Sequence, residues 1–129
     1  MDQGATPYSL TVERKDRYLH VRVSGENTPE TVSRYVAETI AACREHGARR
    51  VLVEEHLTGP SLSQMTMLDI ITDGIGGAGP PALDIAYVDV NPEHDFSRLH
   101  FAETAARNRG YLFHLFPTVP DAEAWLASG

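Results

Sequence analysis

The chain has 129 residues, of which 42% are hydrophobic and 22% charged, so its composition fits one globular domain and excludes a disordered or disulfide-rich protein. Carboxylates outnumber Lys and Arg 18 to 11 and the net charge is −7, which argues against binding to nucleic acid or to an anionic membrane surface. With a single cysteine, no apolar run approaching about 18 residues and no signal core in residues 1–6, we expect a cytoplasmic protein without a disulfide or a membrane span.

The N-terminal part of the chain predicts a loose arm followed by a hairpin. Residues 1–7 are polar and form the arm, and residues 8–129 form a single domain. Apolar and polar residues alternate over 8–13 and again over 18–24, which is the pattern of a strand with one face in water. Because a short charged stretch separates the two runs, we expect them to pair as an antiparallel hairpin.

The next segment predicts a helix over about residues 29–46. Asn27 or Thr28 can cap it, Pro29 suits its first position, and Gly47 is the expected terminator. Its apolar stripe at helical spacing consists of Val32, Val36, Thr39, Ile40 and Cys43. We therefore interpret Cys43 as a buried structural thiol and not as a nucleophile.

The apolar run from Arg50 to Glu54 predicts the central strand of a sheet, and residues 55–63 predict a loop that ends where Ser61 or Ser63 starts a second helix. Residues 74–79 formally match the dinucleotide fingerprint G-x-G-x-x-G. The fingerprint requires a strand before it and a helix opening within it, but here a helix precedes it and Pro80-Pro81 follows. We therefore interpret residues 74–79 as a helix-to-strand loop, with a role as a lid left open.

The rest of the chain alternates strands and helices. Residues 83–90 predict a strand buried on both faces, 96–109 a helix, 111–116 a last strand and 120 onward a short helix. Parallel strands joined by right-handed crossovers that advance in one direction keep the crossover helices on one face. The predicted fold is therefore α/β, a single-layer mixed sheet with an N-terminal hairpin followed by parallel strands and helices wound mainly on one face. Its opposite face is expected to be partly open and available for a homodimer.

Three segments, 50–59, 101–110 and 122–126, together resemble the SpoIIAA-like family, also described as STAS/SEC14 domain proteins. The resemblance implies a sheet with helices wound along it, a binding or regulatory role and no cofactor. In the similar anti-sigma-factor antagonists an Asp-Ser-Ser-Gly turn opens the helix after the central strand, and its second serine is phosphorylated to control partner binding. This chain departs from that motif, because residues 58–63 read Thr-Gly-Pro-Ser-Leu-Ser.

Our first functional hypothesis is a non-catalytic STAS-like module that binds a protein partner or a small apolar ligand. The residues expected to form its binding surface are Glu55, His56, Thr58, Gly59, Ser61, Ser63 and Met65. Phosphate on Ser61 or Ser63 would be well placed beside the free amides of a helix start, although either serine can also be a simple cap.

Two alternatives from other classes remain. Charged groups at the ends of the third and fourth strands are expected to project into one region: Glu54, Glu55, His56, Asp89, His94 and Asp95. A small hydrolase or metal-dependent enzyme would use Glu55, His56 and Asp89, but the spacing fits no compact metal motif, so we expect solvated loop charges and assign no metal. The second alternative is a SEC14-like lipid-binding protein with a closed apolar pocket under the second helix and residues 74–79.

Overall fold

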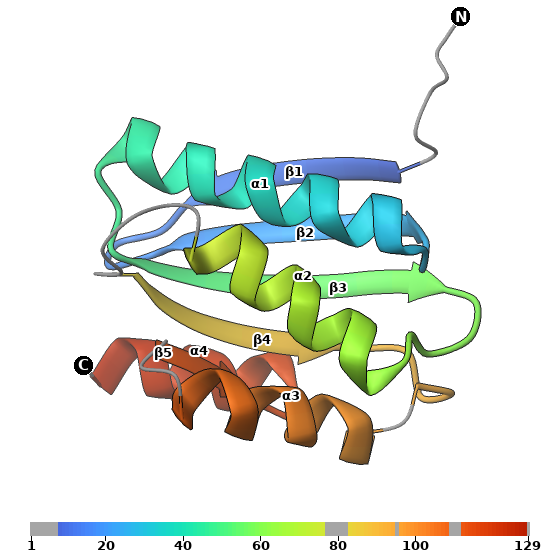
Figure 1. The fold of residues 1–129 in the computed structure, drawn as a ribbon. Helices are drawn as coiled ribbons and strands as arrows, with labels where there is room; N and C mark the ends of the chain where they lie inside the picture. The colour runs from blue at the N-terminus through green and yellow to red at the C-terminus, as the bar shows by residue number, and fades with distance from the viewer. Residues whose placement is uncertain (1–7, 77–82, 95, 109–111, 129) are drawn as a thin grey trace, which may run out of the picture.

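The computed structural model describes residues 8–76, 83–94, 96–108 and 112–128, so the expected arm at 1–7 lies outside the described part. Within these residues, one five-stranded sheet carries four helices, arranged as Figure 1 shows. In chain order the elements are β1 (Tyr8–Arg14), β2 (Leu19–Glu26), α1 (Pro29–His46), β3 (Arg50–Thr58), α2 (Gln64–Gly76), β4 (Asp84–Asp89), α3 (Phe96–Asn108), β5 (Leu112–Leu115) and α4 (Val119–Ser128).

The strands lie in the order β1-β2-β3-β4-β5, so each strand pairs with its neighbour in sequence. The first pair is antiparallel, and the turn between its strands is closed by the Lys15 amide, which donates to the Tyr18 carbonyl at 2.9 Å. The remaining three pairs are parallel. This arrangement confirms the predicted mixed α/β sheet.

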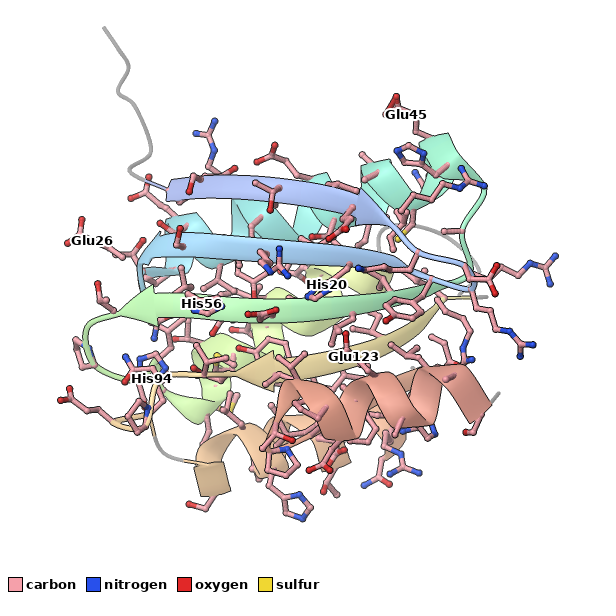
Figure 2. All side chains as sticks on the ribbon, turned by 180° about the vertical axis from the view of Figure 1, so that it is seen from behind. His20, Glu26, Glu45, His56, His94 and Glu123 are labelled. Atoms are coloured by element: carbon pink, nitrogen blue, oxygen red, sulfur yellow. The ribbon has the colours of Figure 1, made fainter. Side chains whose placement is uncertain are left out.

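The three crossover helices, α1, α2 and α3, cover one face of the sheet, as the uniform strand order requires (Figure 1). Their apolar stripes pack against alternate residues of β2, β3 and β4 in the main core. Helix α4 lies on the opposite face (Figure 2). It follows the last strand and joins no two strands, so the handedness of crossovers does not place it with the other three helices. It forms a smaller second core in which Ala122 and Leu126 contact Leu52, Ala86 and Val88.

Helix α1 begins and ends as predicted. The Thr28 hydroxyl accepts a hydrogen bond from the Thr31 amide at 3.1 Å, Pro29 opens the helix, and Gly47 ends it in the left-handed conformation at φ 64°. Cys43 is buried on the inner stripe, and burial raises the pKa of its thiol to about 11. The prediction of a structural thiol is therefore consistent with its surroundings.

Two boundaries differ from the prediction, and both matter for the site. Strand β3 does not end at Glu54 but continues to Thr58, because β2 pairs with it through Glu26↔Thr58. Residues 74–76, predicted as loop, belong to α2, while the rest of the predicted lid and of the fingerprint match, residues 77–79, lies outside the described residues. The charged residues after Glu54 are thus held in a strand.

Candidate functional site

Consecutive residues at the end of β3 face opposite sides of the sheet. Glu55 points to the face covered by helices and is 2% exposed, whereas the neighbouring His56 points to the other face and its side chain is 42% exposed. The candidate catalytic set of Glu55, His56 and Asp89 therefore does not come together, because the sheet separates His56 from the two carboxylates.

Glu55 sits in a pocket of the main core. One of its carboxylate oxygens accepts a hydrogen bond from the hydroxyl of Tyr35 in α1, and Asp89 is its register partner on β4. Burial, and after it the negative charge of Asp89, raises the pKa of Glu55 to about 7. The buried hydroxyl of Tyr87 lies near this carboxyl and acts to lower its pKa. It nevertheless makes no hydrogen bond of normal geometry with any described residue.

The turn after β4 brings His94 against the same pocket. Its Nδ1 lies 2.6 Å from Asp89 Oδ2 and its Nε2 lies 2.7 Å from the Gly59 carbonyl oxygen. Each ring nitrogen thus faces an acceptor, an arrangement that favours the charged imidazolium, and the Asn91 side-chain nitrogen also lies 3.3 Å from Nε2. Burial opposes this charge, but the bonds to Asp89 and Gly59 outweigh it and raise the pKa of His94. The side chains of His94 and Asp89 are only 3% and 4% exposed.

Three of the residues predicted to converge thus do so, in surroundings that were not expected. Glu55, Asp89 and His94 each place one ligand-type atom within 4.8 Å of the other two. They line a cavity of ≈ 10 Å³, whose other lining residues include Leu62, Met67 and Leu99. The expectation of solvated loop charges is wrong for these three side chains. Strand β3 continues past Glu54 and directs Glu55 toward the helices, and the side chains of Asp89 and His94 are buried beside it. The sixth predicted residue, Asp95, lies outside the described residues.

A second charged cluster occupies the open face of the sheet (Figure 2). Glu54 Oε1 lies 2.7 Å from His20 Nε2, its Oε2 lies 2.5 Å from His56 Nε2, and Arg22 donates to it at 3.3 Å. Burial raises the pKa of Glu54, but the hydrogen bonds with His56 and His20 together outweigh burial and lower it. His20 is itself 3% exposed. This cluster is separate from the site around Glu55.

The segment between β3 and α2 is held from both sides. The Asn27 side chain donates to the Pro60 carbonyl at 2.9 Å, and the Asn27 amide donates to the Thr58 carbonyl at 2.7 Å. On the other side His94 holds the Gly59 carbonyl, and Gly59 has a φ of +102°, which residues with a Cβ rarely adopt. The backbone of this segment therefore has a defined shape.

The predicted binding residues around this segment fall into three places. His56, Thr58 and Gly59 line a surface hollow of ≈ 350 Å³, which Val90 and the turn after β4 complete. Ser61 lines the small buried cavity beside Glu55. Ser63 caps α2 by accepting a hydrogen bond from the Thr66 amide at 3.1 Å, and Met65 in the first turn is 62% exposed. Glu55 contributes no exposed surface.

No protein-family model matches the chain, and no curated protein matches it in sequence. Among solved structures it is similar to an anti-sigma factor antagonist from Mycobacterium paratuberculosis, with a TM-score of 0.59. The match covers 93% of this chain and 94% of that chain at 18% sequence identity. The chain has the fold of an anti-sigma factor antagonist. The predicted resemblance to the SpoIIAA-like family is therefore confirmed at the level of the fold.

Sequence reasoning missed the two tyrosines of the site. Tyr35 lies three residues after Val32 on the buried stripe of α1, where its hydroxyl needs a polar partner. Tyr87 lies two residues before Asp89, so alternation along β4 places both side chains on one face. A tyrosine at each of these buried positions was the signal that a polar group lies beneath the helices.

The space for an apolar ligand is small. A cavity of ≈ 40 Å³ lies between α1, α2 and the sheet, lined by apolar residues such as Val36, Ile40, Met67 and Ile70. Small-molecule sites usually measure about 300–1,000 Å³, so this cavity does not support the lipid-binding alternative, which stays a prediction. None of the described helices combines the length and the apolar composition needed to cross a bilayer.

Proposed function

We propose that this chain is a non-catalytic regulatory module that binds a protein partner at the edge of the sheet where β3 and β4 end. The observation that carries the proposal is the fold, which matches over nearly the full length of both chains a protein named as an antagonist of an anti-sigma factor. Since one fold can support many functions, the position of the surface depends on the side chains of this chain.

The exposed apolar residues at this edge support a partner surface. Met65 has the largest exposed fraction among the large hydrophobic residues that the structure describes as exposed, at 62%. Methionine is flexible and polarizable, and it is frequent at surfaces that adapt to a partner. Val90, 37% exposed, lines the hollow together with Thr58 and Gly59, whose backbone is already ordered. A pre-ordered surface loses little conformational entropy on binding.

The enzyme alternative has weaker support from the geometry. The cavity at Glu55, Asp89 and His94 measures ≈ 10 Å³, which is room for about one water molecule and not for a substrate. The open face of the sheet, proposed for a homodimer, carries the charged groups of Arg22, Glu54 and His56. Homodimer interfaces are usually more apolar than this, so a different protein is the better-supported partner.

Ser63 is the better-placed of the two candidate serines for control by phosphorylation. Its hydroxyl already caps α2 on an exposed surface, so a phosphate there would lie beside free amides at the positive end of the helix. The phosphate would add about −1.5 to −2 charge close to Met65. Partner binding should therefore differ between the unaltered chain and Ser63→Asp by more than their stabilities differ, because both serine and aspartate cap a helix well.

Site-directed photo-crosslinking in cells tests the surface. A photoreactive phenylalanine analogue replaces Met65 in one variant and Phe101 of α3, 42% exposed, in the matched control. We expect one protein to be captured from position 65 and not from position 101. With that protein purified, Met65→Glu should weaken binding about 10-fold or more, as loss of an interface anchor does, and Phe101→Glu should leave it unchanged. Equal capture from both positions, or no capture from 65, would contradict the proposal.

A further inference from the structure

The three buried groups Glu55, Asp89 and His94 are each held from outside by a different element. Tyr35 of α1 donates to one oxygen of Glu55, and the Nε2 proton of His94 is donated to the Gly59 carbonyl at 2.7 Å. Histidines that bind metals usually donate their second ring N–H to a carbonyl or carboxylate, which fixes the orientation of the ring. The His94 ring has this orientation, with Nδ1 directed at Asp89.

Asp89 is held in the same way. Its Oδ1 accepts a hydrogen bond from the Asn91 amide at 3.0 Å, and its Oδ2 faces His94 Nδ1 at 2.6 Å. Together with Glu55, each residue directs one ligand-type atom toward the others, and these atoms lie within 4.8 Å of one another. In Asp89 and His94 the outer contacts use the other atom of the group, Oδ1 and Nε2, so an ion beside Oδ2 and Nδ1 would leave those contacts in place.

An independent observation points to a ligand in this place. Tyr87 is 5% exposed, lines the same cavity, and its buried hydroxyl has no hydrogen-bond partner among the described residues. A buried hydroxyl without a partner is costly and uncommon. The cavity of ≈ 10 Å³ has room for one ion or one water molecule. An occupant of this cavity would give the Tyr87 hydroxyl its missing partner.

The geometry points to a divalent transition-metal site formed by Glu55, Asp89 and His94, with Zn²⁺ or Mn²⁺ as the ion. Two carboxylates and one imidazole suit these ions, whereas Ca²⁺ prefers six to eight oxygen ligands. The ion takes the place of the proton between His94 Nδ1 and Asp89 Oδ2, and that proton, together with any proton on Glu55, is released to solvent. Ligand atoms bound at 2.0–2.1 Å lie about 3.3 Å apart, so this pair opens modestly from its 2.6 Å.

The metal-binding activity is separate from the proposed partner binding, and the purified chain of 129 residues suffices to test it. After treatment with a chelator, the chain is titrated with Zn²⁺, Mn²⁺ and Mg²⁺ while the melting temperature and the heat of binding are recorded. We expect one Zn²⁺ or Mn²⁺ per chain and a rise in melting temperature of about 5 °C or more at a 100-fold excess over Kd, reversed by chelator. Mg²⁺ should have a much smaller effect.

The chain offers a matched control cluster of similar composition on the other face. Glu55→Gln, Asp89→Asn and His94→Gln should each weaken Zn²⁺ binding by more than about 100-fold, because each removes a ligand. Tyr87→Phe should weaken it by about 10-fold, as loss of an outer contact does. Glu54→Gln and His56→Gln, which alter the cluster on the open face, should leave the affinity unchanged.

A measurement on the unaltered chain keeps the test independent of the folding of these variants. Bound Mn²⁺ broadens the NMR signals of nearby nuclei, so the ring signals of His94 should disappear before those of His20 and His56. Absence of saturable Zn²⁺ and Mn²⁺ binding would overturn the inference, and so would broadening of His20 and His56 first. In the first case the three groups serve only to hold the turn after β4 against Gly59.

Discussion

Glu54 and Glu55 are neighbours in β3, yet their carboxyl groups have opposite properties. Glu54 lies on the open face between His20 and His56, and these contacts outweigh burial and lower its pKa. Glu55 lies beneath the helices, where burial and the charge of Asp89 raise its pKa to about 7. Because alternate residues of a strand face opposite sides of the sheet, neighbouring carboxyl groups can have pKa shifts of opposite direction.

The two faces also differ in what surrounds their histidines. His56 is 42% exposed and contacts a single carboxylate, whereas His94 is 3% exposed and has an acceptor on each ring nitrogen. Both clusters contain carboxylates and imidazoles, so composition does not separate them. Fixed outer contacts do, because each ring nitrogen of His94 has an acceptor, whereas Nδ1 of His20, which is also 3% exposed, has no hydrogen-bond partner among the described residues.

The largest expected effect is the dependence of stability on the ionisation of Glu55. Its pKa is raised in the folded state, so the folded chain holds this proton where the unfolded chain has lost it. Stability from this group is therefore full below the unfolded value of 4.5 and falls as pH rises toward about 7. At about 1.36 kcal/mol per pKa unit, the loss is about 3 kcal/mol.

Glu55→Gln should remove this loss, because the neutral amide keeps the acceptor for the Tyr35 hydroxyl. Urea unfolding at pH 5 and pH 8, with chelator present, measures the effect. The variant should be more stable than the unaltered chain at pH 8 and similar to it at pH 5. An equal difference at both values of pH would show that Glu55 is already ionised in the folded chain at pH 5.

Much of the fold was predictable because its signals are local. The alternation in β1 and β2, the cap at Thr28 and the terminator at Gly47 each depend on a few neighbouring residues. The end of β3 was not predictable in this way, since Glu55 and His56 look like loop residues by type. The pairing of β3 with β2, up to Glu26↔Thr58, holds them in the strand, and pairing is a long-range property.

The site was predictable in position but not in character. Parallel strands end at a common edge, so the convergence of Glu55, Asp89 and His94 follows from the order of the strands. Their burial depends on α1, which brings Tyr35 over Glu55 from 20 residues away. No pattern within β3 or β4 contains that information, and the expectation of solvated charge was wrong for this reason.

The second prediction compares the two tyrosines above Glu55. Tyr35 donates to Glu55, so Tyr35→Phe should leave a buried carboxyl without its donor and cost about 2 kcal/mol. Tyr87→Phe removes a hydroxyl that has no partner among the described residues, so in chelator-treated protein it should be neutral or slightly stabilising. Thermal and urea unfolding of both variants at one pH make the comparison. Equal destabilisation by both would mean that the Tyr87 hydroxyl already has a partner.

The smallest effect belongs to the open face. The pKa of Glu54 is lowered, so its contribution to stability is present above the unfolded value of 4.5 and is lost as pH falls through the lower folded value. Glu54→Gln should therefore cost about 1 kcal/mol at pH 7, within the range of a partly solvated charge pair, and less at pH 3. Because His56 and Arg22 are exposed, this cost should shrink in high salt, whereas the effect of Glu55→Gln should not. A salt-independent cost for Glu54→Gln would mean that the open face is covered in solution, as the predicted homodimer requires.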